Sequence, residues 1–165
     1  MKIELKKIEF SERMSEETNA FTAELNINGK KVGHCRNDGR TDYNAYSPEL
    51  RPVIAEAEAY CETLPKVKFS NMEFDQSLES VIEQLLEDWL QAKEQKKLER
   101  KMQTGILWGV PNAGTYTYLN YGMPLSGLAQ TAPKTLQERI NKIKADLKAG
   151  EVILNTNLQE LGLNV

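Results

Sequence analysis

The stretch that decides the fold is residues 75–102, which read DQSLESVIEQLLEDWLQAKEQKKLERKM. Its apolar residues recur at the three- and four-residue spacing of one helix face, and Asp75 is suited to cap the first turn. Acidic side chains come first and basic side chains last, the order that the helix dipole favours. After Leu90 the only large apolar residues are Leu98 and Met102. The pattern predicts one long helix whose second half lies in solvent or against a partner.

A β-hairpin is predicted before this helix. Residues 21–27 alternate apolar and polar side chains, Asn28-Gly29 follows at once, and residues 30–36 form the return strand. The Asn-Gly dipeptide supplies the positive φ angles of a type I′ turn. Four other elements are expected before the long helix: a strand over 3–10 with a break at 6–7, a polar loop over 37–44, a helix over 48–64 capped by Ser47, and a strand over 67–74.

Four more elements are expected after the long helix. They are a second hairpin of strands 105–110 and 115–121, a loop over 124–133, a helix from a Thr135–Glu138 capping box to Gly150, and a short buried strand over 152–154.

These elements predict an α+β fold, with a mostly antiparallel sheet of five to six strands built from two hairpins and three helices packed against it. The 165 residues contain no internal repeat, low-complexity segment or linker. We therefore expect a single globular α+β domain over residues 1–165.

Composition excludes several classes of protein. The net charge of -3 argues against a general nucleic-acid binder, which normally has a basic face. No apolar run approaches the roughly 18 residues of a membrane span, and the start Met1-Lys2-Ile3-Glu4 is not that of a signal peptide. Two cysteines without a secretion signal read as reduced thiols, so a cytoplasmic protein is expected.

Few residues are suited to catalysis or metal binding. His34 is the only histidine, and on a strand it points away from its neighbour Cys35. With Cys61 the only other cysteine, no paired-ligand spacing suggests zinc. The chain also lacks a P-loop and a dinucleotide glycine fingerprint. We assign no catalytic residue, metal or cofactor, and nothing requires an enzyme.

Two stretches are suited to binding a small molecule. The first combines guanidinium, amide and aromatic groups, which together hold a phosphate or ribose beside a stacked ring. The second is a cluster of aromatic side chains, amides and glycines that suits a planar ligand. The candidate ligand-binding residues are Arg36, Asn37, Arg40 and Tyr43 in the first stretch, and Trp108, Asn112, Tyr116, Tyr118 and Asn120 in the second. An alternative stays open for each stretch. The arginines of the first stretch are then solvated loop charges, and the tyrosines of the second form the solvent-exposed face of a hairpin.

Three parts of the chain also resemble a known group of proteins. They are residues 10–40 with the Ile27–Gly33 turn, the Trp108–Asn112 turn, and the Asn155–Leu158 ending. Together they resemble small proteins of phages and bacterial mobile elements that have long been labelled hypothetical. The resemblance implies a phage or prophage accessory protein, located in the host cytoplasm. By analogy of genomic context, such a protein counters host defence by sequestering a nucleotide signal, such as a cyclic dinucleotide or a cyclic ADP-ribose.

The leading hypothesis is therefore a non-enzymatic protein that binds and sequesters a nucleotide-like small molecule. Arg36 and Arg40 would meet phosphates, the aromatic residues would stack on the base, and the asparagines would bond its edges. The alternative is an interaction protein whose helix around 93–102 docks on a host or phage protein. A nucleotide-directed hydrolase is a third, weaker hypothesis, and a homo-oligomer stays open.

Overall fold

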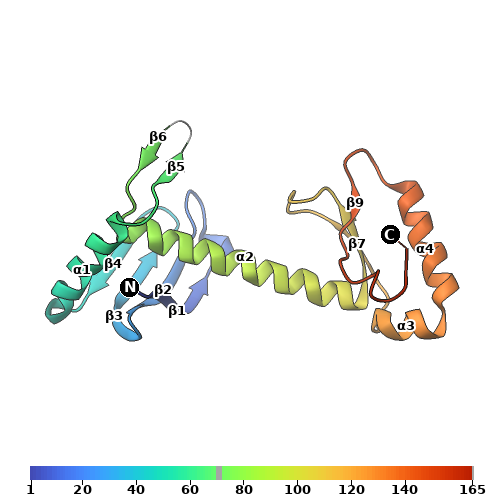
Figure 1. Cartoon of the computed structure of the whole chain (residues 1–165), viewed down its shortest axis with the longest axis horizontal. Coiled ribbons are helices and arrows are strands. Elements are labelled where there is room, and N and C mark those ends of the chain that lie inside the picture. The colour runs from blue at the N-terminus through green and yellow to red at the C-terminus, as the bar shows by residue number, and fades with distance from the viewer. Residues whose placement is uncertain (70–71, 165) are drawn as a thin grey trace. The chain divides into compact units, whose positions relative to one another are not determined.

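Two compact units make up the chain in the computed structural model, which describes residues 1–69 and 72–164 (Figure 1). The first unit spans Met1–Leu90 and the second spans Gln91–Val165. Each unit has a hydrophobic core of its own. We expect a single domain, in which the two units fold together and not independently. This expectation of a single domain stays a prediction.

A four-stranded antiparallel sheet forms the first unit, in the order β1 (Ile3–Phe10), β2 (Phe21–Ile27), β3 (Lys30–Asn37) and β4 (Asp42–Tyr46). The β2–β3 hairpin is confirmed, with φ of 49° at Asn28 and 82° at Gly29. The strand β4 falls partly inside the predicted polar loop 37–44, so that loop interpretation is wrong for its second half. Pairing with β3 satisfies the backbone groups along one edge of β4 although its side chains are mostly polar.

The predicted break in the first strand is confirmed. The register between β1 and β2 shifts between Lys6 and Glu9, and Lys7 has a φ of 51°. This β-bulge lets Ile8 join Ile3 and Leu5 against the core.

Two helices cover one face of this sheet. A 3-10 turn, η2 (Pro48–Leu50), leads into α1 (Arg51–Glu62), and the long helix α2 (Leu78–Thr104) crosses the same core. Another 3-10 turn, η1 (Glu12–Met14), follows β1. The core joins sheet residues to one stripe from each helix: Leu25, Val32 and Cys35 from the sheet, Ile54, Ala57 and Cys61 from α1, and Leu78, Ile82 and Leu86 from α2. Ser47 makes no capping hydrogen bond with its side chain, contrary to expectation.

The long helix begins at Leu78, two residues later than a cap at Asp75 predicts. Ser77 Oγ accepts from the Ser80 amide at 3.1 Å, and Ser80 Oγ accepts from the Ser77 amide at 2.9 Å. This reciprocal pair caps the helix, so the prediction that Asp75 is the cap is wrong. Asp75 instead forms an ion pair with Lys66 at 3.0 Å.

The single strand predicted over 67–74 is two strands. β5 (Val67–Phe69) and β6 (Met72–Phe74) pair antiparallel, with Lys68 opposite Glu73. Those two side chains form an ion pair at 3.2 Å. The turn between the strands lies outside the described residues.

A three-stranded antiparallel sheet forms the second unit, in the order β8 (Thr117–Asn120), β7 (Gly105–Gly109) and β9 (Val152–Ile153). The second predicted hairpin is therefore confirmed. The predicted loop 124–133 contains a helix, α3 (Leu125–Thr131), whose small residues hid its pattern. Val152 of the predicted buried strand is in fact exposed.

The helix α4 (Pro133–Asp146) packs the predicted stripe of Leu136, Ile140 and Ile143 into the second core. It begins at Pro133, before Thr135, so the predicted capping box is wrong. Proline suits the first turn because it has no amide hydrogen to leave unpaired. The helix ends at Asp146, also short of the predicted stop at Gly150.

The fold class is thus confirmed as α+β with antiparallel sheets, but the predicted number of elements is wrong. Within residues 1–69 and 72–164 the chain forms four α-helices and sheets of four, two and three strands. The three-helix, single-sheet expectation failed because α3, β4 and the β5–β6 pair lack strong periodicity.

Candidate functional site

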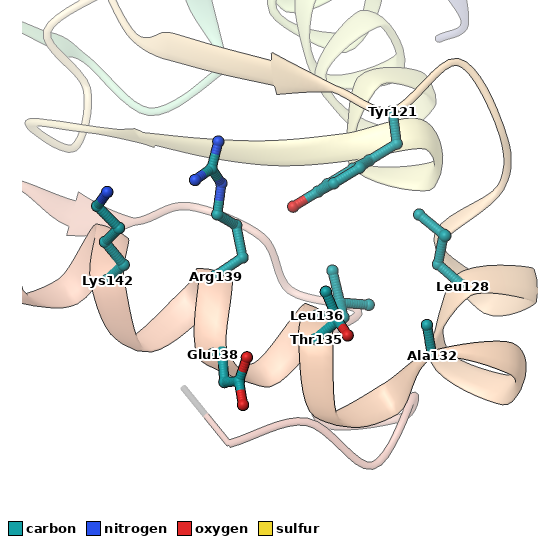
Figure 2. Close-up of a pocket in the computed structure, with 8 residues that line it drawn as sticks. All are labelled: Tyr121, Leu128, Ala132, Thr135, Leu136, Glu138, Arg139 and Lys142. Atoms are coloured by element: carbon teal, nitrogen blue, oxygen red, sulfur yellow. The ribbon is translucent and has the colours of Figure 1, made fainter.

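A cavity of the second unit lies between the residue that follows β8 and the helices α3 and α4. It encloses about 430 Å³. Figure 2 shows its lining, which is Tyr121, Leu128, Ala132, Thr135, Leu136, Glu138, Arg139 and Lys142. The volume falls within the roughly 300–1,000 Å³ of small-molecule sites.

Backbone hydrogen bonds place Tyr121 in this cavity. Its amide donates to the Thr104 carbonyl at 2.9 Å, and Asn120 Oδ1 accepts from the Gly122 amide at 2.9 Å. Gly122 then takes a φ of 70°, which turns the chain away from the sheet toward α3. Strand alternation directs Tyr121 to the same sheet face as Ile106, Trp108 and Leu119, where the helices pack.

The Tyr121 hydroxyl is an exception among buried polar groups. Its oxygen is shielded from solvent, and no described residue offers it a hydrogen bond of acceptable geometry. Burial raises the pKa of the phenol, and the Arg139 guanidinium opposes this shift through its charge and through a contact that is close to, but not well aligned for, a hydrogen bond with the hydroxyl. Buried polar groups are usually paired with protein or with ordered water, so this hydroxyl retains hydrogen-bonding capacity that a water or a ligand in the cavity could use.

Cations line one part of the same cavity. Arg139 and Lys142 lie one turn apart on α4, and both are exposed. Neither forms an ion pair with a carboxylate of the described residues. The lining carboxylate, Glu138, points away from the Tyr121 phenol in Figure 2. The cavity therefore offers positive charge without an opposing acid directed into it.

The residues predicted to bind a ligand belong to both units. Arg36, Asn37, Arg40 and Tyr43 lie in the first unit, and Trp108, Asn112, Tyr116, Tyr118 and Asn120 lie in the second. A pocket shared by the two stretches stays a prediction. Two of the four side chains in the first unit and four of the five in the second have structural partners within the protein.

Arg36 and Tyr43 are brought together. They lie directly opposite each other on β3 and β4, and both are exposed. Arg36 also lines a second cavity of about 400 Å³, together with Asn37, Phe10 and Phe21. Two carboxylates, Glu9 and Asp38, line that cavity too, so its charge favours an anion less than that of the cavity beside Tyr121.

Asn37 and Arg40 hold loops together. Asn37 Oδ1 accepts from Thr18 Oγ1 at 3.0 Å and from the Gly39 amide at 2.7 Å, and its Nδ2 donates to Asp42 at 2.7 Å. Arg40 Nε donates to Glu16 at 2.9 Å, and a second guanidinium nitrogen contacts the same carboxylate. Asn37 is buried and bonded on both amide atoms, whereas Arg40 is exposed.

The aromatic cluster predicted in the second unit divides between two faces of the hairpin. Trp108 packs against the core with Ile106, because both lie on the helix-covered face. Tyr116 and Tyr118 lie on the other face and bond to the end of α2. Lys101 Nζ donates to Tyr116 Oη at 2.6 Å, and the Thr104 and Tyr118 hydroxyls lie 2.7 Å apart.

The two predicted asparagines of this hairpin occupy turns. Asn112 is exposed and has a φ of 61° in the turn after β7, a conformation that asparagine tolerates well. Asn120 holds Gly122 as described above. Tyr121, Arg139 and Lys142 were not among the predicted binding residues. The signal was weak: two basic residues flank the apolar stripe of α4, as on many surface helices.

The cysteines and the histidine behave as expected of structural residues. Cys35 and Cys61 are buried and unbridged, and burial raises the pKa of the Cys35 thiol to about 12. His34 is exposed on β3. No three acidic, histidine or cysteine side chains of the described residues gather as a metal-ligand set. No helix within the described ranges is long and apolar enough to cross a membrane.

No family model, curated protein or solved structure matches this chain.

Proposed function

We propose that this protein binds a nucleotide-like small molecule without transforming it, and that the cavity between Tyr121 and α4 is the binding site. The observation that carries this proposal is the buried Tyr121 hydroxyl, which has no hydrogen-bond partner among the described residues. A ligand oxygen in the cavity would supply that partner. This site replaces the two predicted stretches because most of their polar groups are bonded within the protein.

The shape and chemistry of the cavity support a small organic ligand. Leu128, Ala132 and Leu136 offer apolar surface, and the Tyr121 ring offers an aromatic face. Arg139 and Lys142 add two cationic side chains. Predominantly apolar walls with a few polar groups are typical of ligand sites, and a phosphorylated planar molecule satisfies both parts.

The biological role that we propose is sequestration. A phage accessory protein that binds a cyclic nucleotide or an ADP-ribose derivative would lower the free concentration of a host defence signal. This step is supported by the sequence resemblance described above.

A protein partner is the alternative, and one observation favours it. Gln91 to Lys97 are exposed along α2, which leaves a continuous charged helix surface. Apolar anchors are scarce there, since Leu98 is half-buried and Met102 is buried. The Met102 carbonyl also accepts from Asn157 Nδ2 at 3.0 Å. A partner on this surface would therefore bind mainly through charges.

Native mass spectrometry of the purified chain followed by calorimetric titration tests the proposal. The titration panel contains cyclic dinucleotides, cyclic ADP-ribose isomers and mononucleotides. We expect at least one to bind, and Tyr121→Phe to weaken it about tenfold, because one hydrogen bond to a charged group is worth about 1.5–3 kcal/mol. Tyr43→Phe, a tyrosine outside the cavity, is the matched control.

No binding to ligand-free protein across the panel would overturn the small-molecule proposal and favour the protein partner. Chromatography of the same mixtures tests for turnover. Conversion of a bound nucleotide would replace sequestration with the hydrolase hypothesis.

A further inference from the structure

Polar and apolar groups occupy different parts of the Tyr121 cavity. Figure 2 shows the phenol oxygen and the side chains of Arg139 and Lys142 toward one end, and Leu128 and Ala132 toward the other. Thr135 and Leu136 lie between them. A ligand that fills this space should therefore carry its charge at one end and its apolar or planar part at the other.

The polar end offers three different donors. Arg139 presents a guanidinium fork, Lys142 an ammonium group, and Tyr121 a hydroxyl. Guanidinium groups bond two oxygens of a phosphate or carboxylate at once, and an ammonium group adds a point charge. The Tyr121 phenol is protonated at neutral pH because its ordinary pKa is about 10 and burial raises it further, so it can act as a donor. These groups together match an anion with several equivalent oxygens.

Access to the Tyr121 hydroxyl requires a neighbouring side chain to move, and Arg139 is the nearby charged one. The oxygen of Tyr121 is covered from solvent, so a ligand reaches it only when a neighbouring side chain moves. Arg139 is exposed and has no ion pair among the described residues, and its rotation therefore breaks no salt bridge. An oxoanion that draws the guanidinium aside can accept from both residues.

The geometry points to a ligand with a terminal oxoanion, a phosphate monoester or a carboxylate, bound by Tyr121, Arg139 and Lys142, with its apolar or planar body against Leu128, Ala132 and Leu136. This inference rests on the small-molecule binding proposed above and specifies the charge distribution of the ligand. It disfavours ligands whose phosphates are all internal, such as cyclic nucleotides and ADP-ribose, and so departs from the proposed sequestration role at that point. A cyclic dinucleotide carries its charges at its centre, between two bases, and fits this one-ended distribution poorly. A nucleoside monophosphate fits it well.

Matched pairs of probes test this inference by calorimetric titration of the full chain, shown to be ligand-free by native mass spectrometry. One pair is adenosine 5′-monophosphate with adenosine, and the other is phenylacetate with 2-phenylethanol. We expect the anion of at least one pair to bind at least tenfold more tightly than its neutral counterpart. The pair that shows this difference distinguishes phosphate from carboxylate.

Variants locate the effect. Arg139→Gln and Lys142→Gln should each weaken the anion about tenfold and leave the neutral counterpart unchanged. Lys144→Gln, an exposed lysine of the same helix that does not line the cavity, should change neither affinity. Circular dichroism melts check that each variant folds.

The outcomes separate the two proposals. Equal affinity for both members of each pair, or tighter binding of a cyclic dinucleotide than of the monophosphate, would overturn the terminal-oxoanion inference and leave small-molecule binding in place. Loss of affinity in Lys144→Gln equal to that in Lys142→Gln would also overturn it. Failure of every probe and of the wider nucleotide panel would overturn the proposed function itself.

Discussion

Asn155 accepts a hydrogen bond from the backbone amide of Leu107 at 2.7 Å, and its side-chain nitrogen donates to the Gly105 carbonyl at 3.0 Å. The two ends of this contact lie 48 residues apart in sequence. One buried side chain thus takes the place of a neighbouring strand beside β7. The Asn155 side chain extends the pairing of β9 with β7 by one residue, because the amide of the preceding Leu154 donates to the Leu107 carbonyl at 2.9 Å.

Replacing Asn155 should therefore destabilise the second unit. Asn155→Ala leaves the Leu107 amide and the Gly105 carbonyl buried without this partner, at about 1–3 kcal/mol for each group. Urea denaturation should show a loss of about 2–6 kcal/mol for the two groups together. Asn141→Ala, an exposed asparagine of α4, is the control and should cost less than about 0.5 kcal/mol. A similar loss in both variants would contradict the structural role of Asn155.

Two turn glycines should respond differently to alanine. Gly29 has a φ of 82° with open space around the missing side chain, whereas a Cβ on Gly39, φ 98°, would come within 1.9 Å of the Met14 carbonyl oxygen. Gly29→Ala should therefore cost about 1–2 kcal/mol of backbone strain alone, and Gly39→Ala clearly more. Gly29→Val should also destabilise the protein. Thermal melts measure the difference, and a Gly39 variant as stable as the wild type would contradict the close approach of the two loops.

The two halves of α2 should differ in their sensitivity to truncation. Leu86 is 2% exposed in the first core, so Leu86→Ala should cost about 2–5 kcal/mol. Leu98 is half-buried and follows Leu90, the last residue of α2 that packs against this core. Leu98→Ala should therefore lower the free energy of unfolding by well under about 2 kcal/mol. Chemical denaturation of the two variants is the measurement. Equal losses would indicate that the second half of the helix is buried in an oligomer.

Acid should weaken an ion-pair network on the open face of the first sheet. Lys31 and Lys7 donate to Glu24 at 2.8 and 3.0 Å, and these hydrogen bonds lower the pKa of Glu24 from 4.5 to about 2. A lowered pKa in the folded state means that Glu24 stabilises the protein fully above about pH 4.5 and loses this effect as the pH falls toward 2.

Glu24→Gln should therefore flatten the loss of stability between pH 4.5 and pH 2. Melting temperatures across this range test the expectation. Glu9→Gln serves as the control, because Glu9 lies on the same sheet face and forms no ion pair with the described residues. An unchanged pH profile in Glu24→Gln would show that the two lysines do not stabilise the carboxylate.

The sequence by itself determined the elements whose signals are local. Asn28-Gly29 specified its hairpin because the positive φ angles of that turn depend on two adjacent residues. The apolar stripe of Leu136, Ile140 and Ile143 specified the buried face of α4 because a helix repeats over few residues. The same reasoning found the break near Lys7 but missed α3, whose small residues give little periodicity.

Only the tertiary structure decided which side chains meet. Strand alternation placed Trp108 on the helix-covered face of the β7–β8 hairpin, and Tyr118 on the other face beside Tyr116 and Lys101. The packing of α4 near the end of β8 brought Arg139 to the same cavity as Tyr121, although the two residues are 18 positions apart in the sequence. The partners of Asn37 and Asn155 likewise come from distant parts of the chain. Backbone preferences act between neighbours, whereas a binding cavity depends on packing between elements, and a single sequence does not show that packing.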